Sequence, residues 1–120
     1  VYGGIQHTKP VREIVSKEIP DEDWIHVAVN YDLAAKKMEL LVNGQSQGTA
    51  SYDLPAGGRI ADLMIGARYH NRKKDYDIMF PAQMMIDEVR ISDSIRPALP
   101  LPDKEFTKDD NSLLLLHCEN

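Results

Sequence analysis

The sequence has 120 residues, of which 42% are hydrophobic and 28% are charged, and its formal net charge is −5. This length fits one domain, and the composition is that of a globular chain. The negative charge argues against a general affinity for nucleic acid or anionic lipid, because both need a basic protein face. The longest apolar run, residues 113–116, is far shorter than the roughly 20 residues of a membrane-spanning helix. We therefore expect no nucleic-acid partner and no membrane insertion.

Cysteine content and the first residues bear on the origin of the chain. Cys118 is the only cysteine, so the disulfide framework of many small secreted domains is absent. Residues 1–4 resemble neither a signal peptide nor a natural start. We expect the chain to be a piece of a longer, processed protein.

Alternation of apolar and polar residues runs through most of the chain and predicts β-strands. No segment predicts a convincing helix. Residues 31–37 could form a helical turn, but 32–35 are expected to form a loop between strands. Further loops are expected at 53–58 and 67–80, and prolines at 97, 100 and 102 predict an extended linker. In chain order, the expected strands are 12–19, 24–31, 37–42, 46–52, 61–66, 83–92 and 112–118.

Two of these strands carry more specific expectations. Strand 24–31 is uncharged on both faces, which favours a central strand that is covered on both sides. Asn43-Gly44 follows strand 37–42, and this dipeptide readily adopts the positive φ angles of a type I′ turn. The sequence therefore predicts a hairpin between 37–42 and 46–52.

Three ordered motifs carry a resemblance to a known family. They are Trp24-Ile25-His26-Val27-Ala28, then Leu40-Leu41-Val42-Asn43-Gly44, then Ile65-Gly66 followed after a variable loop by Ile86-Asp87-Glu88-Val89-Arg90-Ile91-Ser92. A final segment, Asn111 to Glu119, is similar to one that often follows the third motif. In this order and spacing they resemble the laminin G-like branch of the concanavalin A-like lectin/glucanase superfamily.

The resemblance implies an all-β fold, an antiparallel β-sandwich of the concanavalin A-like jelly-roll type. Such a sandwich has about a dozen strands, so the chain is expected to be an incomplete piece that lacks N-terminal strands. Residues 1–110 are expected to form the laminin G-like domain, and 111–120 either its final strand or the start of a following repeat. Met84 departs from the family pattern, which has a small residue there, and predicts packing under a neighbouring surface.

Catalysis is not expected. The glucanases of the superfamily place carboxylates on one face of a strand in a Glu-x-Asp-x-x-Glu pattern, which is absent here. Asp87 and Glu88 are adjacent and point to opposite faces. The four histidines show no metal-ligand spacing, and His26 is expected to be a hydrogen-bonded structural residue. Cys118, at the end of an apolar strand, is expected to be a small buried hydrophobe.

The polar loop 68–77 is the best binding candidate in the sequence. Its Tyr69 and Tyr76 offer rings for stacking on sugars, and Asn71 and Arg72 offer hydrogen-bond donors. The alternative is a solvated loop whose basic residues neutralise Asp75 and Asp77. These four residues, Tyr69, Asn71, Arg72 and Tyr76, are the expected ligand-binding set.

Asp87 shares an alternating face with Val89 and Ile91, so it is expected to point inward. A buried carboxylate needs hydrogen-bond donors, an arginine or a cation. The resemblance adds a structural Ca²⁺ to these alternatives, with Asp87 as a candidate ligand.

Taken with the resemblance, these features favour a non-catalytic, lectin-like carbohydrate-binding module of a larger secreted or cell-surface protein, expected to be bacterial. The expected partners are a glycan or polysaccharide and other domains of the same parent protein. Two alternatives remain: a protein–protein adhesion module, and a structural accessory domain of a glycoside hydrolase.

Overall fold

The computed structural model describes residues 2–5, 12–19, 23–51, 63–72, 75–79 and 81–118. Within this part of the chain every regular element is a β-strand, and every strand pair is antiparallel, which confirms the expected all-β fold. No helix that could cross a membrane occurs among these residues. The strands are β1 (Tyr2–Ile5), β2 (Arg12–Val15), β3 (Val27–Asp32), β4 (Lys37–Val42), β5 (Gln45–Ser51), β6 (Arg68–Arg72), β7 (Asp75–Met79), β8 (Glu88–Ser92) and β9 (Ser112–His117).

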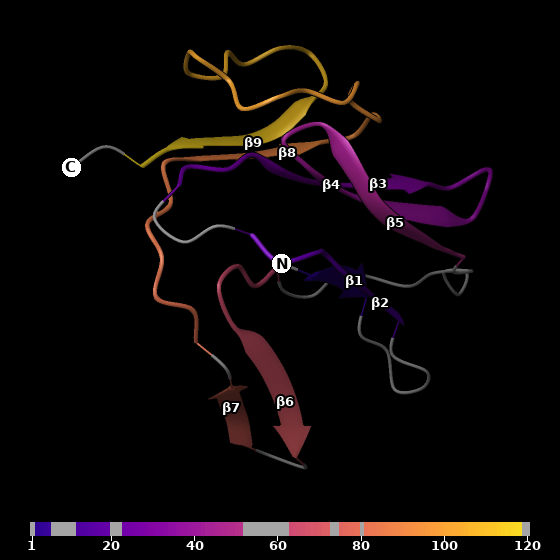
Figure 1. Cartoon of the computed structure of the whole chain (residues 1–120), viewed down its shortest axis with the longest axis vertical. Helices are drawn as coiled ribbons and strands as arrows, with labels where there is room; N and C mark the ends of the chain where they lie inside the picture. The colour runs from indigo at the N-terminus through magenta and orange to yellow at the C-terminus, as the bar shows by residue number, and fades with distance from the viewer. Residues whose placement is uncertain are drawn as a thin grey trace.

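The described strands form one three-stranded sheet and three two-stranded ribbons. The sheet has the order β3-β4-β5, and the ribbons are β1-β2, β6-β7 and β8-β9. Figure 1 shows β8, β9 and β3 at similar height in one layer, the β1–β2 ribbon beneath the β4–β5 side, and the β6–β7 ribbon set apart from them. The strands are thus arranged in more than one layer, as in a sandwich, but much of the second layer is not present in the described residues.

The predicted hairpin is confirmed. Asn43 and Gly44 connect β4 to β5, and both have positive φ angles, 48° and 77°. Two such residues in sequence form the type I′ turn whose twist matches that of the paired strands. The ladder contains a bulge, because Leu40 lies opposite Gly48 whereas Leu41 lies opposite Ser46. The loop expected at 32–35 is present as a turn at 33–36 between β3 and β4, and the Asp32 carboxylate accepts a hydrogen bond from Ala35 N at 2.9 Å.

The core lies between the three-stranded sheet and β2. Met38 and Leu40 are almost fully buried, and Ile14 of β2 packs against them, with Tyr31 and Ala50 at the margin. Met38 lies opposite both Tyr31 and Ala50 in the ladders, so these residues share one face of the sheet. Burial of each large aliphatic side chain stabilises the fold by about 1.5–3 kcal/mol.

Segment 93–111 packs against β3 and β8, where Asn30 and Glu88 form hydrogen bonds with its backbone. An ion pair joins residues near its two ends. Both terminal nitrogens of Arg96 contact the carboxylate of Asp109, with Nη2 at 2.6 Å from Oδ1. Ser112 Oγ donates to the same carboxylate at 2.8 Å, and Asp93 N donates to Asn111 O at 3.0 Å. The hydrogen bonds from Arg96 and then Ser112 hold the pKa of Asp109 well below its usual range, and Asp109 in turn raises the pKa of Arg96.

Two expectations for residues 61–80 are wrong. The stretch 63–66 is not a strand, because it bends at Gly66, whose φ is 80°, and Leu63 and Ile65 are exposed with no strand beside them among the described residues. The expected loop at 67–80 instead contains the β6–β7 ribbon. The charged residues of 67–80 predicted a loop. Tyr76 and Ile78 occupy alternate positions, and residues of these types favour a strand.

The remaining strands are partly as expected. Strand 12–19 is confirmed only at 12–15, and strand 83–92 only at 88–92, while β1 was not predicted. The stretch expected at 24–31 begins at Val27 and forms an edge of the described three-stranded sheet instead of its centre. The expected loop at 53–58 lies outside the described residues.

Candidate functional site

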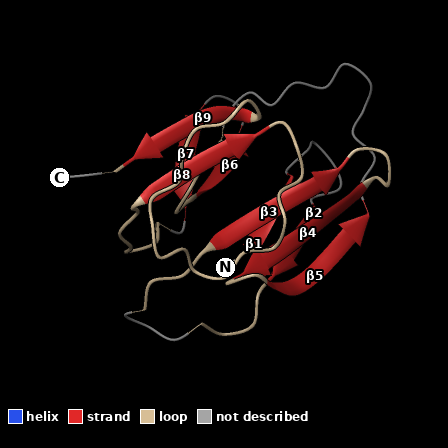
Figure 2. Ribbon diagram, turned by 90° about the horizontal axis from the view of Figure 1, so that it is seen from above, coloured by secondary structure: helices blue, strands red, loops and turns tan. Residues whose placement is uncertain are grey.

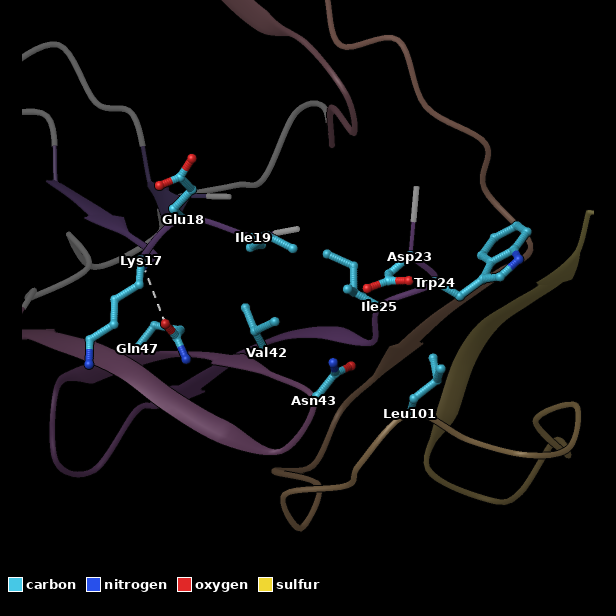
Figure 3. Close-up of a pocket in the computed structure, with 10 residues that line it drawn as sticks. All are labelled: Lys17, Glu18, Ile19, Asp23, Trp24, Ile25, Val42, Asn43, Gln47 and Leu101. Atoms are coloured by element: carbon cyan, nitrogen blue, oxygen red, sulfur yellow. Dashed lines mark hydrogen bonds between the residues drawn. The ribbon is translucent and has the colours of Figure 1, made fainter. Parts of the chain in front are cut away.

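A hollow of about 690 Å³ lies beside the β4–β5 turn and the segment that leads into β3 (Figure 3). Its aliphatic lining comes from Ile19 and Ile25 before β3, Val42 at the end of β4, and Leu101. Polar side chains surround this apolar patch. The lining residues in the described part of the chain are Lys17, Glu18, Ile19, Asp23, Trp24, Ile25, Val42, Asn43, Gln47 and Leu101.

Trp24 supplies an aromatic surface at one end of the hollow. In Figure 3 its indole lies at the opposite end from Lys17, with Asp23 and Ile25 between them. The side chain is 53% exposed, although a tryptophan usually buries most of its large apolar surface. Asp23 and Glu18 are also exposed, and Figure 3 shows Asp23 near the indole and Glu18 at the opposite end of the hollow, beside Lys17. An aromatic ring beside hydrogen-bonding groups suits a ligand that has both an apolar face and hydroxyl groups.

The two amides in the lining are held by the protein itself. Asn43 Oδ1 accepts a hydrogen bond from His26 N at 2.8 Å. Gln47 Oε1 accepts from Lys17 N at 3.3 Å, and its Nε2 donates to Gln45 O at 3.2 Å. These bonds fix the amides and tie residue 17 to β5, so one wall of the hollow is built by side chain to backbone contacts.

The sequence interpretation missed this hollow. The sequence analysis gave Trp24 and Asn43 only structural roles, in a strand and in the hairpin turn. The hollow is lined by Lys17, Asn43 and Leu101, which are far apart in the sequence. The one available signal was the pair Asp23-Trp24, a carboxylate directly before a large aromatic residue that lies outside the alternating pattern of β3.

The expected ligand-binding residues Tyr69, Asn71, Arg72 and Tyr76 lie in the β6–β7 ribbon, of which the structure describes the backbone and not the side chains. The backbone register pairs Tyr69 with Ile78, Asn71 with Tyr76, and Arg72 with Asp75. The ligand-binding set and its alternative, a loop whose basic residues neutralise Asp75 and Asp77, both stay predictions.

Asp87, the candidate metal ligand, is exposed just before β8, and its backbone oxygen accepts a hydrogen bond from Cys118 N at 2.6 Å. Within the described residues, no group of three or more His, Cys, Asp or Glu side chains is placed to hold a metal ion. The expectation of a buried Cys118 is wrong, because the thiol lies exposed just after β9.

Glu88 has contacts through both carboxylate oxygens. Oε1 lies 2.6 Å from His117 Nδ1 on β9, and Oε2 accepts a hydrogen bond from Phe106 N at 3.3 Å. The guanidinium of Arg90 lies 4.2 Å from the centre of the Phe106 ring. These contacts fasten segment 93–111 to the β8–β9 ribbon and give Glu88 a structural role in this arrangement.

His26 has the structural role that was expected. Its Nδ1 lies 3.3 Å from Leu99 O, and its ring meets that of Phe106 edge to face at 5.8 Å. His7 lies outside the described residues, and of His70 only the backbone in β6 is described.

Comparison with known proteins agrees with the motifs. A family model described as the concanavalin A-like lectin/glucanases superfamily matches residues 4–98, which is most of the chain. No curated protein and no solved structure matches the chain significantly. The matched span contains the Trp24 segment, the Asn43-Gly44 hairpin and β8, in the order in which the motifs occur. The chain therefore belongs to the concanavalin A-like lectin/glucanase superfamily, as a laminin G-like domain with an incomplete sandwich.

Proposed function

We propose that the chain is a non-catalytic carbohydrate-binding module of a larger secreted or cell-surface protein, bacterial in origin. Membership of a superfamily of lectins and glucanases supports binding as its general role. The observation that carries the finer proposal is the hollow at Trp24, whose described lining combines a half-exposed indole with two carboxylates and two amides held by hydrogen bonds.

The chemistry of the hollow fits a neutral or amino sugar better than an acidic one. Glu18 and Asp23 can accept hydrogen bonds from hydroxyl or ammonium groups, whereas they would repel a carboxylate or sulfate. Among the lining residues that the structure describes, Lys17 is the only Lys or Arg. The indole supplies the apolar surface on which the C–H face of a sugar ring can lie.

A glycan array followed by titration calorimetry tests this proposal. We expect binding to a neutral or amino-sugar oligosaccharide, and a loss of about tenfold or more in affinity for Trp24→Ala, which corresponds to about 1.4 kcal/mol. Leu33→Ala is the matched control, because Leu33 is also an exposed large hydrophobe but lies in the turn at 33–36. Absence of binding to every glycan, or equal affinity of Trp24→Ala and wild type, would contradict a sugar site at Trp24.

The β6–β7 ribbon is the second possible sugar site, and variants separate the two. If Tyr69→Ala with Tyr76→Ala abolishes binding while Trp24→Ala does not, the ribbon residues that the sequence indicated are the site. If the Tyr69→Ala/Tyr76→Ala double variant still binds the sugar, the sugar site is the hollow at Trp24. Array glycans carrying sulfate or uronic acid discriminate further, because Arg72 would favour them and Glu18 with Asp23 would not.

A protein–protein adhesion module is the second candidate function, and one specific observation favours it. Large hydrophobic side chains are exposed on several described strands, among them Val29 at 49% and Leu116 at 48%. Apolar surface of this kind is typical of a protein contact more than of a sugar site. The same surface would suit a structural accessory domain that packs against its parent enzyme.

A further inference from the structure

The hollow at Trp24 has an aliphatic middle between two different ends. In Figure 3 the indole and Lys17 lie at opposite ends, and the side chains of Ile25 and Val42 lie between them. Leu101 adds to this aliphatic surface and is 44% exposed, while Ile25 is half-buried. A ligand that stacks on the indole therefore also meets an aliphatic surface in the same hollow.

Asn43 presents an oriented hydrogen-bond donor in this hollow. Figure 2 shows the starts of β3 and β5 at the same end of the three-stranded sheet, where the β4–β5 turn meets the residues that precede β3. There Asn43 Oδ1 accepts a hydrogen bond from His26 N at 2.8 Å, and Asn43 N donates to His26 O at 2.8 Å. These two bonds fix the side-chain amide, which points from the turn into the hollow (Figure 3).

The Nδ2 group of Asn43 is free to bind a ligand. Its amide oxygen is the atom that His26 N contacts, so Nδ2 and its two N–H groups are left over. Among the residues that the structure describes, none accepts a hydrogen bond from this nitrogen. The hollow thus offers an N–H donor at a set position beside its aliphatic surface.

Asp23 supplies an acceptor across the hollow from Asn43. Figure 3 places its carboxylate beside Ile25, on the opposite side of the hollow from the β4–β5 turn. The side chain is exposed, and no described residue donates a hydrogen bond to the carboxylate or forms an ion pair with it. Its oxygens can therefore accept from an N–H or O–H group of a ligand.

A sugar that carries only hydroxyl groups does not use all of these features. Its C–H face can lie on an indole, but its edges carry hydroxyls, which are unfavourable against an aliphatic surface that offers them no partner. An N-acetyl group combines a methyl, a carbonyl that accepts and an N–H that donates. These three parts match the aliphatic surface, Asn43 Nδ2 and the Asp23 carboxylate in turn.

An unacetylated amino sugar matches the hollow less completely. Its ammonium group is attracted by Asp23, but it brings no methyl to the aliphatic surface and no acceptor to Asn43 Nδ2. That donor then keeps its hydration and contributes nothing to the affinity of the sugar.

We propose that the hollow is selective for N-acetylated amino sugars. The acetamido methyl lies on the aliphatic surface, the carbonyl accepts from Asn43 Nδ2, the N–H donates to Asp23, and the sugar ring lies on the Trp24 indole. Asn43 is then the specificity-determining residue. This inference rests on the proposed carbohydrate-binding function and names the sugar class that the site takes.

Fluorescence titration tests the proposal, because Trp24 is the only tryptophan in the sequence and lines the hollow. The probes are three β-1,4-linked trisaccharides that differ at C2 of each ring: those of N-acetylglucosamine, glucosamine and glucose. N-acetylgalactosamine and galactose repeat the comparison in the other common ring configuration. We expect the N-acetylated member of at least one set to bind about tenfold or more tighter than its unacetylated counterparts.

Asn43→Asp separates the donor from the turn. Aspartate keeps an acceptor for His26 N and tolerates the positive φ of 48°, but it has no Nδ2 donor. We expect the ratio of affinities for acetylated and unacetylated sugar to fall towards one in this variant. Asn111→Asp makes the same chemical change at an exposed position outside the hollow and should keep the wild-type ratio. Each ratio compares two sugars on one variant, so a partial loss of stability affects both affinities alike.

Three outcomes would overturn the selectivity while sugar binding at Trp24 stands. The first is equal affinity of wild type for the acetylated and unacetylated members of both sets. The second is tightest binding of the glucosamine trisaccharide, which would indicate attraction of the ammonium groups by the carboxylates. The third is an Asn43→Asp variant that keeps the full preference. If no sugar binds at all, in these titrations or on the glycan array, the proposed function itself is wrong and the selectivity with it.

Discussion

Asn43 and His26 are joined by two hydrogen bonds of the same length. Asn43 Oδ1 accepts from His26 N at 2.8 Å, and Asn43 N donates to His26 O at 2.8 Å. The same asparagine has a φ of 48° as the first residue of the β4–β5 turn. It therefore shapes the hairpin and also fixes the segment from which Trp24 projects, so the turn and the candidate sugar site depend on one side chain.

Gly44 should be the most sensitive turn position. Its φ of 77° disfavours any side chain, and a Cβ there would lie 2.8 Å from Leu99 O, a backbone atom that cannot easily move. We expect Gly44→Val to lower the free energy of unfolding by about 1–3 kcal/mol from backbone strain alone, measured by urea denaturation.

Gly66→Val is the matched control for this variant. Its φ of 80° gives similar backbone strain, but its Cβ would meet the end of the flexible Met84 side chain instead of backbone. The Gly44 variant should therefore be the less stable of the two. Equal losses, or a Gly44 variant that melts like wild type, would show that the turn does not have this conformation in solution.

The Arg96–Asp109 pair should make stability depend on acid pH. The folded pKa of Asp109 lies below its ordinary value because Arg96 and Ser112 donate hydrogen bonds to the carboxylate. A carboxyl group whose pKa is lower in the folded protein than in the unfolded chain stabilises the fold at pH values above its unfolded pKa, which is about 3.9. This stabilisation decreases as the pH falls below about 3.9. Unfolding midpoints measured between neutral pH and about pH 2 should decrease in wild type.

Asp109→Asn isolates this contribution, and Asp103→Asn, an exposed aspartate of the same segment, is its control. The Asp109 variant should be less stable at neutral pH, and its stability should decrease less on acidification. If the unfolding midpoint of Asp109→Asn depends on pH in the same way as those of wild type and Asp103→Asn, the Arg96–Asp109 pair does not cause the loss of stability at acid pH.

The chain should not hydrolyse polysaccharides. Asp87 is exposed, and Glu88 is engaged by His117 and Phe106 N, so the described strand β8 offers no carboxylate pair directed at one point. Incubation of purified protein with β-glucans should release no reducing sugar above the level of a heat-treated sample. Steady hydrolysis that Asp87→Asn or Glu88→Gln abolishes would reverse this assignment.

Features that depend on neighbouring residues could be predicted from the sequence. The Asn43-Gly44 turn and β4 follow from φ preferences and a short alternating pattern. The structural role of His26 could also be predicted, because a polar side chain in an otherwise uncharged strand needs a hydrogen-bond partner. The β6–β7 ribbon was missed because charge and strand propensity compete there, and pairing decides between them.

Features that depend on distant residues could not be predicted in the same way. The hollow at Trp24 joins Lys17, Asn43 and Leu101, and no periodic pattern relates these positions. Cys118 and Leu116 are residues of types that are usually buried, yet both are exposed in the structure. The local sequence pattern indicates which residues are apolar enough for a core. Which of them are buried depends on how the strands pack in the folded protein.

The last prediction is that the 120 residues alone do not close a sandwich. In the described residues the buried hydrophobic core consists of Ile14, Met38, Leu40, Leu41 and Val42, whereas Met85 is 80% exposed and Leu113 is 66% exposed. Exposed apolar area on this scale binds hydrophobic dyes or drives association. The isolated chain should therefore bind such a dye and self-associate with rising concentration, and amides of β3 should exchange faster than those of β4, whose two edges are both paired. A monodisperse monomer without dye binding, in which β3 exchanges as slowly as β4, would show that the chain completes its own core.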